Sequence, residues 1–139
     1  MLTTPPNTDQ TLTARTSALL LARAYVALLR VDLLIARRGF SGLYKELRAL
    51  SARRDSTNGR IEEICRYVDL ASVLYFKEVR CLQRSAATTS LLRKEGFSAE
   101  VVIGVHTCPF RAHAWVELAG VVVNDKPYIS SMYAIIDRF

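Results

Sequence analysis

Three residues in the second half of the chain have the side chains of a nucleophile, a base and an orienting acid. Cys81 opens a stretch with helical periodicity, His113 lies in the strand-like run AHAWVEL, and Asp125 ends the next run, VVVND. A cysteine is a good nucleophile only as its thiolate, which a helix N-terminus and nearby cations favour. Arg80 and Arg84 flank Cys81 in the sequence. Together these residue types could form a catalytic relay with a thiol nucleophile. Each also has a structural interpretation: Cys81 as a small buried hydrophobe, His113 as a hydrogen-bonded strand residue and Asp125 as a turn former.

The spacing of His113 and Asp125 bears on whether the two side chains can meet across a hairpin. Strand alternation puts His113 and Trp115 on one face. A three-residue loop over Leu118–Gly120 would pair residue 117 with 121 and therefore 113 with 125. Asp125 would then face His113 and orient its imidazole, whereas a two-residue loop would put them on opposite faces. We therefore predict the three-residue loop.

The other two cysteines have simpler interpretations. Cys65 lies on the apolar stripe of a helix predicted over residues 60–76, where it is a small buried hydrophobe. Cys108 lies in a predicted loop. His106, Cys108 and His113 are close enough in sequence to be considered as metal ligands, but their spacing matches no strong zinc pattern. We expect no metal and no other cofactor.

The composition is that of one globular domain. The chain has 139 residues, of which half are apolar and 23% are charged, enough for one hydrophobic core. Residues 1–10 contain two prolines and no periodic apolar pattern, so we expect a flexible lead there. Residues 11–139 should form a single domain, with a helical part over 11–79 and a catalytic helix with a sheet over 80–139.

Periodicity predicts helices first and strands second. The predicted helices run from near Thr11 or Thr13 to Gly39, from Ser41 to Leu50, over residues 60–76, and from Cys81 to Glu95 with Gly96 ending the last. The predicted strands are FSAEVVIGV, AHAWVEL, VVVND and YAIIDRF. This order is typical of an α+β domain in which N-terminal helices pack on a small antiparallel sheet.

The basic charge alone does not identify a partner. The net charge is +6, and one face of the first predicted helix carries four arginines: Arg15, Arg23, Arg30 and Arg37. Such a face is commonly solvated, but it could also contact a partner protein, an acidic peptide, a nucleic acid or an anionic membrane surface. A dense basic run with interleaved aromatic residues, which would favour nucleic acid, is missing.

The apolar run over residues 16–36 is about as long as a membrane-spanning helix. Arg23, Arg30 and Asp32 interrupt it, and charges near the centre of such a helix would be costly in hydrocarbon. We therefore expect no membrane span. Three widely spaced cysteines with no secretory signal before them indicate a reducing cytoplasm.

The motifs CLQRSAATTSLLRKEGFSAEVVIGV and AHAWVELAGVVVND resemble the B2 leader peptidases of lasso peptide biosynthesis, which belong to the transglutaminase-like cysteine proteases. The resemblance covers the chain from Cys81 onward, and the intervals from Cys81 to His113 and from His113 to Asp125 fit the family. It implies a transglutaminase-like, papain-like core. In that core Cys81 would be the nucleophile, His113 the general base and acid, and Asp125 the orienter.

The resemblance also implies a pathway and partners. The enzyme would remove the leader from a ribosomally made lasso peptide precursor, upstream of a separate ATP-dependent cyclase. No leader-recognition domain precedes the helices, so the chain resembles the split form that acts with a separate B1 protein. Candidates for the substrate site are Leu82, Gln83, Phe110 and Trp115, with Gln83 the nearest side chain to complete an oxyanion hole.

Two other functions remain open at the level of sequence. One is a non-catalytic helical adaptor that binds a peptide or nucleic acid. The other is a transglutaminase-like enzyme that uses the same thioester but lets an amine replace water, so that the product is a new amide.

Overall fold

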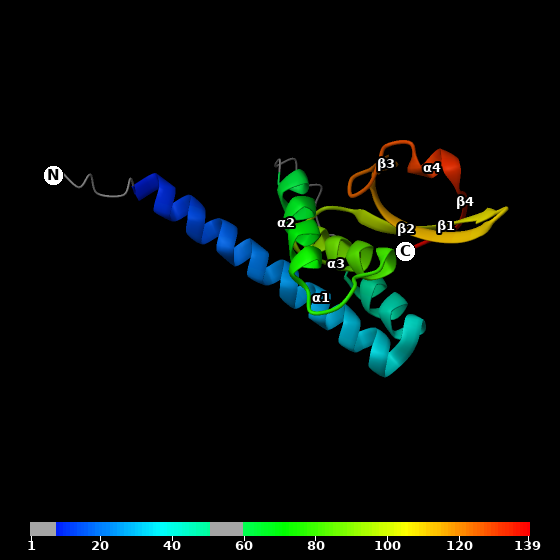
Figure 1. The fold of residues 1–139 in the computed structure, drawn as a ribbon, viewed down its shortest axis with the longest axis horizontal. Helices are drawn as coiled ribbons and strands as arrows, with labels where there is room; N and C mark the ends of the chain where they lie inside the picture. The colour runs from blue at the N-terminus through cyan, green and yellow to red at the C-terminus, as the bar shows by residue number, and fades with distance from the viewer. Residues whose placement is uncertain (1–7, 51–59) are drawn as a thin grey trace.

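The structure, a computed structural model, describes residues 8–50 and 60–139 (Figure 1). Its helices are α1 (Thr8–Ala49), α2 (Ile61–Leu74), α3 (Cys81–Lys94) and α4 (Ile129–Met132). Its strands are β1 (Ala99–Thr107), β2 (Phe110–Leu118), β3 (Val121–Val122) and β4 (Ala134–Arg138), arranged in the antiparallel order β3-β2-β1-β4. The predicted α+β class is confirmed.

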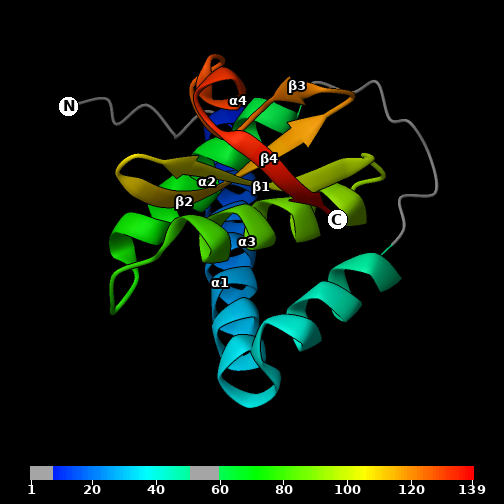
Figure 2. The ribbon, with the colours of Figure 1, turned by 90° about the vertical axis from the view of Figure 1, so that its right-hand side faces the viewer.

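A break at Gly39 divides α1 into two helical segments. Gly39 has a φ of 66° and a ψ of −166°, and glycine reaches this conformation without the steric cost that a Cβ imposes. The predicted helix stop at Gly39 is therefore confirmed. Figure 2 shows how the chain turns there and continues as the second segment.

The start of α1 differs from the prediction. The helix begins at Thr8 and not near Thr11 or Thr13, which is consistent with Asp9 in the first turn, where a negative charge stabilises a helix. Residues 8–10 are thus helical and do not belong to a flexible lead, and the rest of that predicted lead lies outside the described residues. In the described part of the chain no helix, α1 included, is long and apolar enough to cross a membrane.

Three helices lie on one face of the sheet. α1 contacts α2 and α3, and α3 contacts β1 and β2, so α3 is the layer next to the sheet (Figure 1). Cys65 is buried in this core with 6% of its surface exposed, which confirms its interpretation as a small hydrophobe. Burial raises the pKa of its thiol to about 11, so it is protonated at neutral pH.

The opposite face of the sheet carries a smaller apolar cluster. Val102 and Trp115 pack there with Ile129 of α4. The sheet is therefore covered on both faces, and α3 and α4 approach the same strands from opposite sides.

The β2–β3 hairpin does not have the predicted register. Glu117 pairs with Val122 and Leu118 with Val121, so the loop contains two residues, Ala119 and Gly120. The predicted three-residue loop over Leu118–Gly120 is wrong because Ala119, like Gly120, has a positive φ, as the common two-residue turn requires. A regular continuation of this ladder would put Asp125 on the face opposite to His113.

β3 ends after two residues, and side chains replace the rest of its ladder. The Val123 N–H still donates to the Val116 carbonyl at 3.0 Å, but the Val116 N–H donates to Oδ1 of Asn124 at 2.7 Å. Nδ2 of Asn124 donates to Oγ of Ser85 at 3.1 Å, and that hydroxyl donates to the Ala114 carbonyl, also at 3.1 Å. Ser85 and Asn124 are both buried. We call these bonds the edge network, because they satisfy the backbone groups at the edge of β2 beyond the end of β3.

Replacing Asn124 with Ala removes the acceptor of a buried N–H and the donor to Ser85. We expect a loss of about 1–3 kcal/mol in the free energy of unfolding, because the Val116 N–H is left without a partner. Urea denaturation measures this loss. Ser131→Ala is the control, because its exposed hydroxyl bonds only to the Tyr128 carbonyl, and its effect should stay within about 0.5 kcal/mol. Equal stabilities of the two variants would contradict the edge network.

Candidate active site

His113 and Asp125, the predicted base and its orienting acid, are in contact. Nε2 of His113 lies 2.8 Å from Oδ2 of Asp125, and the two side chains are 22% and 14% exposed. They meet although the predicted register is wrong, because the chain leaves the ladder at Asn124 and bends toward β2. With Nε2 bonded to the carboxylate, Nδ1 is the ring nitrogen that remains for proton transfer.

Aromatic rings hold the imidazole from the other side. His113 stacks on Trp115 with centroids 6.1 Å apart, and Tyr133 lies 5.5 Å from the same ring. Gly104 is the cross-strand partner of His113, and a Cβ there would come within 2.7 Å of both Trp115 and Tyr133. Close packing of the rings therefore depends on glycine at this position.

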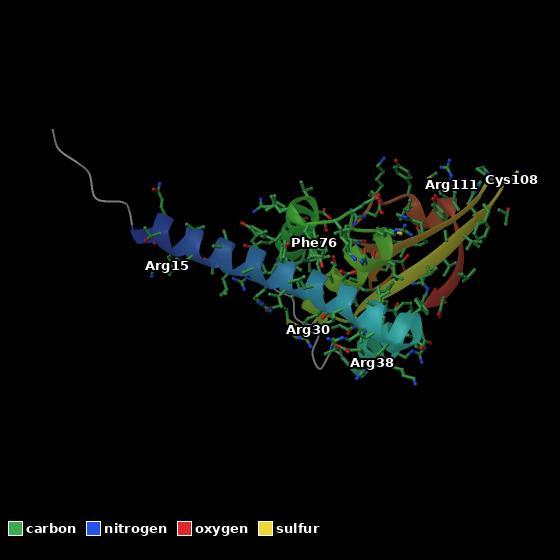
Figure 3. All side chains as sticks on the ribbon, turned by 60° about the horizontal axis from the view of Figure 1, so that its bottom comes forward. Arg15, Arg30, Arg38, Phe76, Cys108 and Arg111 are labelled. Atoms are coloured by element: carbon green, nitrogen blue, oxygen red, sulfur yellow. The ribbon has the colours of Figure 1, made fainter. Side chains whose placement is uncertain are left out.

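Trp115 and Phe110, two of the predicted substrate-site residues, differ in how far they are exposed. Trp115 is fully buried and packs against His113, so its ring is not exposed to a ligand. Phe110 is exposed beside the turn of the β1–β2 hairpin. Figure 3 shows the neighbouring Cys108 and Arg111 at the far end of that hairpin, away from α1.

Arg84 connects α3 to Asp125. Its guanidinium lies 3.4 Å from Oδ2 of Asp125 and 3.4 Å from Oδ1 of Asp69. The sequence suggested Arg84 only as a cationic neighbour of Cys81, whereas the structure places its charge between two carboxylates. Residues three apart share a helix face, so this contact also turns the Cys81 side of α3 toward Asp125.

The charges around Asp125 outweigh the effect of its burial. Burial raises the pKa of its carboxyl group, but hydrogen bonds from His113 and the Lys126 N–H, with the charges of His113 and Arg84, bring the pKa below its usual value. For Asp69 burial prevails, and the pKa is raised despite the attraction of Arg84. Of the two carboxylates that flank Arg84, Asp125 is therefore the one with the lowered pKa.

Cys81 is the first residue of α3 and is half-buried. Ser85, one helical turn later on the same face, bonds to the Ala114 carbonyl next to His113. The edge network thus fixes the first turns of α3 beside the open edge of β2. Within the described residues no hydrogen bond joins the Cys81 thiol to His113, and such contacts are often loose in the absence of substrate.

Asp32 of α1 fixes the segment that leads into α3. Its carboxylate accepts hydrogen bonds from Nζ of Lys77 at 2.6 Å, Nε2 of Gln83 at 2.8 Å and the Tyr75 hydroxyl at 3.3 Å. Oε1 of Gln83 accepts the Arg80 N–H at 3.0 Å. Both ends of the Gln83 amide are therefore engaged in holding the helix start. Sequence reasoning used Asp32 only as an argument against a membrane span.

An open groove of about 730 Å³ lies beside Cys81. It is lined by residues from α2, the connection to α3 and the first turn of α3, among them Asp69, Val73, Phe76, Cys81 and Arg84. Val73 and Phe76 are exposed apolar side chains on its wall, and Figure 3 marks the position of Phe76. None of the four predicted substrate-site residues lines this groove, and Leu82 packs against the core instead.

The metal alternative finds no support in the geometry. Nδ1 of His106 lies 3.2 Å from the Pro109 carbonyl oxygen within its own hairpin turn. Across residues 8–50 and 60–139, no three His, Cys, Asp or Glu side chains are grouped so that they could hold a metal ion.

Comparison with known proteins assigns the class. The profile of the transglutaminase-like superfamily matches residues 25–137, and the chain belongs to this superfamily. A curated relative is the microcin J25-processing protein McjB of Escherichia coli, which is 41% identical over 56 residues. This match covers 40% of the present chain and 27% of the length of McjB. No solved structure matches the chain significantly.

Replacing Asp125 with Asn should reduce stability in a pH-dependent way. The lowered pKa means that the ionised carboxylate stabilises the folded state above its unfolded pKa of about 3.9, and that this contribution is lost as the pH falls through the folded-state pKa. The difference in unfolding free energy between wild type and Asp125→Asn should therefore be largest near neutral pH and shrink below about pH 4. Urea titrations from pH 7 to pH 3 measure it.

The control for this prediction is Asp137→Asn, because among the described residues the Asp137 side chain accepts only the N–H of its neighbour Arg138. A stability difference for Asp125→Asn that is no larger at pH 7 than at pH 3 would contradict the charge network described above.

Proposed function

We propose that this protein is a cysteine protease that removes the leader from a lasso peptide precursor. The observation that carries the proposal is the 2.8 Å contact between His113 and Asp125 beside the helix that begins with Cys81. Membership of the transglutaminase-like superfamily and the partial identity with a microcin-processing protein support it. In this proposal Cys81 is the nucleophile, His113 the base and acid, and Asp125 the orienter.

In the first step the Cys81 thiolate attacks the carbonyl carbon of the last leader residue. A bond forms between sulfur and carbon, and the carbonyl electrons move to the oxygen. The N–H groups of the first turn of a helix have no carbonyl partner within it, so those of α3 would stabilise this oxyanion. Asp125 keeps the imidazole of His113 oriented and stabilises the protonated ring.

In the second step the carbon–nitrogen bond breaks. His113 gives its proton to the leaving amine, which is the new N-terminus of the core peptide, and the leader remains as a thioester on Cys81. His113 then takes a proton from water, the hydroxide attacks the thioester carbon, and the leader leaves as a carboxylic acid while the thiol is restored.

The groove beside Cys81 is the most suitable place for the peptide near the cut. Its wall combines exposed apolar side chains, Val73 and Phe76, with the charges of Asp69 and Arg84. A separate B1 protein would present the leader, and the freed amine of the core would pass to the cyclase. Both partners belong to the proposal and follow from the family resemblance.

An amide-exchanging enzyme is the second candidate, because the superfamily name and the same thioester are compatible with it. An amine would then attack the thioester in place of water. The two reactions give products of different mass, since one ends in a free acid and the other in a new amide.

Replacing Cys81 with Ser should abolish cleavage of a precursor from the same gene cluster, assayed with its B1 protein by mass spectrometry. We expect a loss of at least about 1,000-fold, because a serine hydroxyl is a much weaker nucleophile than a thiolate. The wild-type leader product should carry a free carboxylic acid.

Cys108→Ser is the matched control, because Cys108 is an exposed free thiol and should leave cleavage unchanged. Cleavage by Cys81→Ser at the wild-type rate would overturn the protease assignment. A leader product that carries a new amide would favour amide exchange, and peptide binding without any change in mass would favour an adaptor.

A further inference from the structure

The surface of α1 that faces away from the core carries an exposed apolar stripe. Leu12, Leu19, Val26 and Leu33 recur every seven residues, Leu29 falls between the last two, and these five side chains are 40–67% exposed. The buried side of the same helix is a different set, which includes Leu20, Ala24, Leu28 and Val31. We call the exposed set the α1 stripe.

The spacing of the α1 stripe is that of a coiled-coil seam. Ala22 and Ala36 are exposed at the intervening positions, so the seam alternates intervals of three and four residues. From Leu12 to Leu33 it covers three heptads, or about 30 Å at the rise of an α-helix. A narrow seam of this kind favours one partner helix over a membrane surface, which needs a wider apolar face.

The beginning of α1 contributes no buried residue to the core. From Asp9 to Leu19 no residue is buried. Figure 1 shows this part extending beyond the other elements. Helical stability in proteins comes mainly from packing of an apolar face, so this part would gain most from a partner.

The charges beside the α1 stripe are positive. Arg23, Arg30 and Arg37 follow one flank at seven-residue spacing, and Arg15 lies within the stripe. Figure 3 shows Arg15 and Arg30 along the helix. Arg23 pairs with Glu95 at 2.9 Å and Arg30 with Glu46 at 3.7 Å. Arg15 and Arg37 are exposed and form no ion pair with a described residue, so they are the charges that remain for a partner. The acid of the opposite flank, Asp32, is already bonded to Lys77 and Gln83.

This charge pattern disfavours a second copy of the chain. If two copies paired in antiparallel orientation, their arginine flanks would face each other. If they paired in parallel, the arginine flank of one copy would face the flank of the other that carries Asp32, whose carboxylate is already bonded to Lys77 and Gln83. We therefore infer that the α1 stripe binds an acidic amphipathic helix of a separate protein, with apolar residues at heptad spacing and Glu or Asp beside them. This inference does not depend on the proposed protease activity.

The test uses two labelled synthetic peptides of three heptads, both with Leu at the seam and with either Glu or Lys at the flanking positions. Fluorescence anisotropy with the full chain should show saturable binding of the Glu peptide only, and added salt should weaken it. The double variant Leu19→Glu/Val26→Glu should weaken binding by at least about tenfold. Arg15→Glu/Arg37→Glu should weaken the Glu peptide and admit the Lys peptide.

Ile136→Glu is the control, because it adds a carboxylate at an exposed apolar position of β4 and should leave binding unchanged. Circular dichroism confirms that each variant folds. Equal binding of the two peptides, or of neither, would overturn the inference. So would a dimer in sedimentation, or adsorption to phosphatidylglycerol vesicles, that is lost in Leu19→Glu/Val26→Glu, because the stripe would then serve a second copy or a membrane.

Discussion

The edge of β2 between Ala114 and Val116 is where the sheet, α3 and the candidate relay are joined. β3 pairs for only two residues, and the free backbone groups beyond it bond to Asn124 and Ser85. A longer β3 would satisfy these groups with its own backbone and would carry Asp125 to the other face of the sheet. Its early end has two consequences: Asp125 meets His113, and the first turns of α3 dock beside them.

Two carboxylates connect the helical layer to this edge. The carboxylate of Asp32 accepts hydrogen bonds from the side chains of Tyr75, Lys77 and Gln83, close to the start of α3. Asp125 accepts from His113 and faces Arg84, which comes from the first turn of the same helix. Because a buried carboxylate is costly unless it is bonded, each acid favours the arrangement of chain that surrounds it. The start of α3 is thus held from α1 on one side and from the sheet on the other.

The sequence predicts the elements better than the way they join. Gly39, Gly96 and the apolar periods place the helix ends and four strands, because these signals depend on local backbone preferences. The predicted length of the β2–β3 loop was wrong because Ala119 adopts a positive φ, which residue type alone does not indicate. The contact between His113 and Asp125 was predicted from the sequence, but the prediction relied on a hairpin register that the protein does not have.

The parts that sequence did not reveal depend on long-range contacts. Asp32 and Gln83 are 51 residues apart in the chain, and Ser85 and Asn124 are 39 apart. The groove beside Cys81 is formed by the end of α2 and the connection that follows, which offered no motif. Asn124, which follows the apolar run Val121–Val123, was the one feature of the sequence that could have indicated the early end of β3. The side chain of an asparagine can form hydrogen bonds with backbone groups in place of the strand ladder.

Activation of Cys81 by His113 can be measured as the rate at which the Cys81 thiol is alkylated. Iodoacetamide modification at neutral pH can be followed by mass spectrometry for Cys81 and, in the same molecule, for the exposed Cys108. We expect His113→Ala to slow modification of Cys81 by at least about tenfold and to leave the rate at Cys108 unchanged. An equal rate for Cys81 in wild type and His113→Ala would contradict this activation.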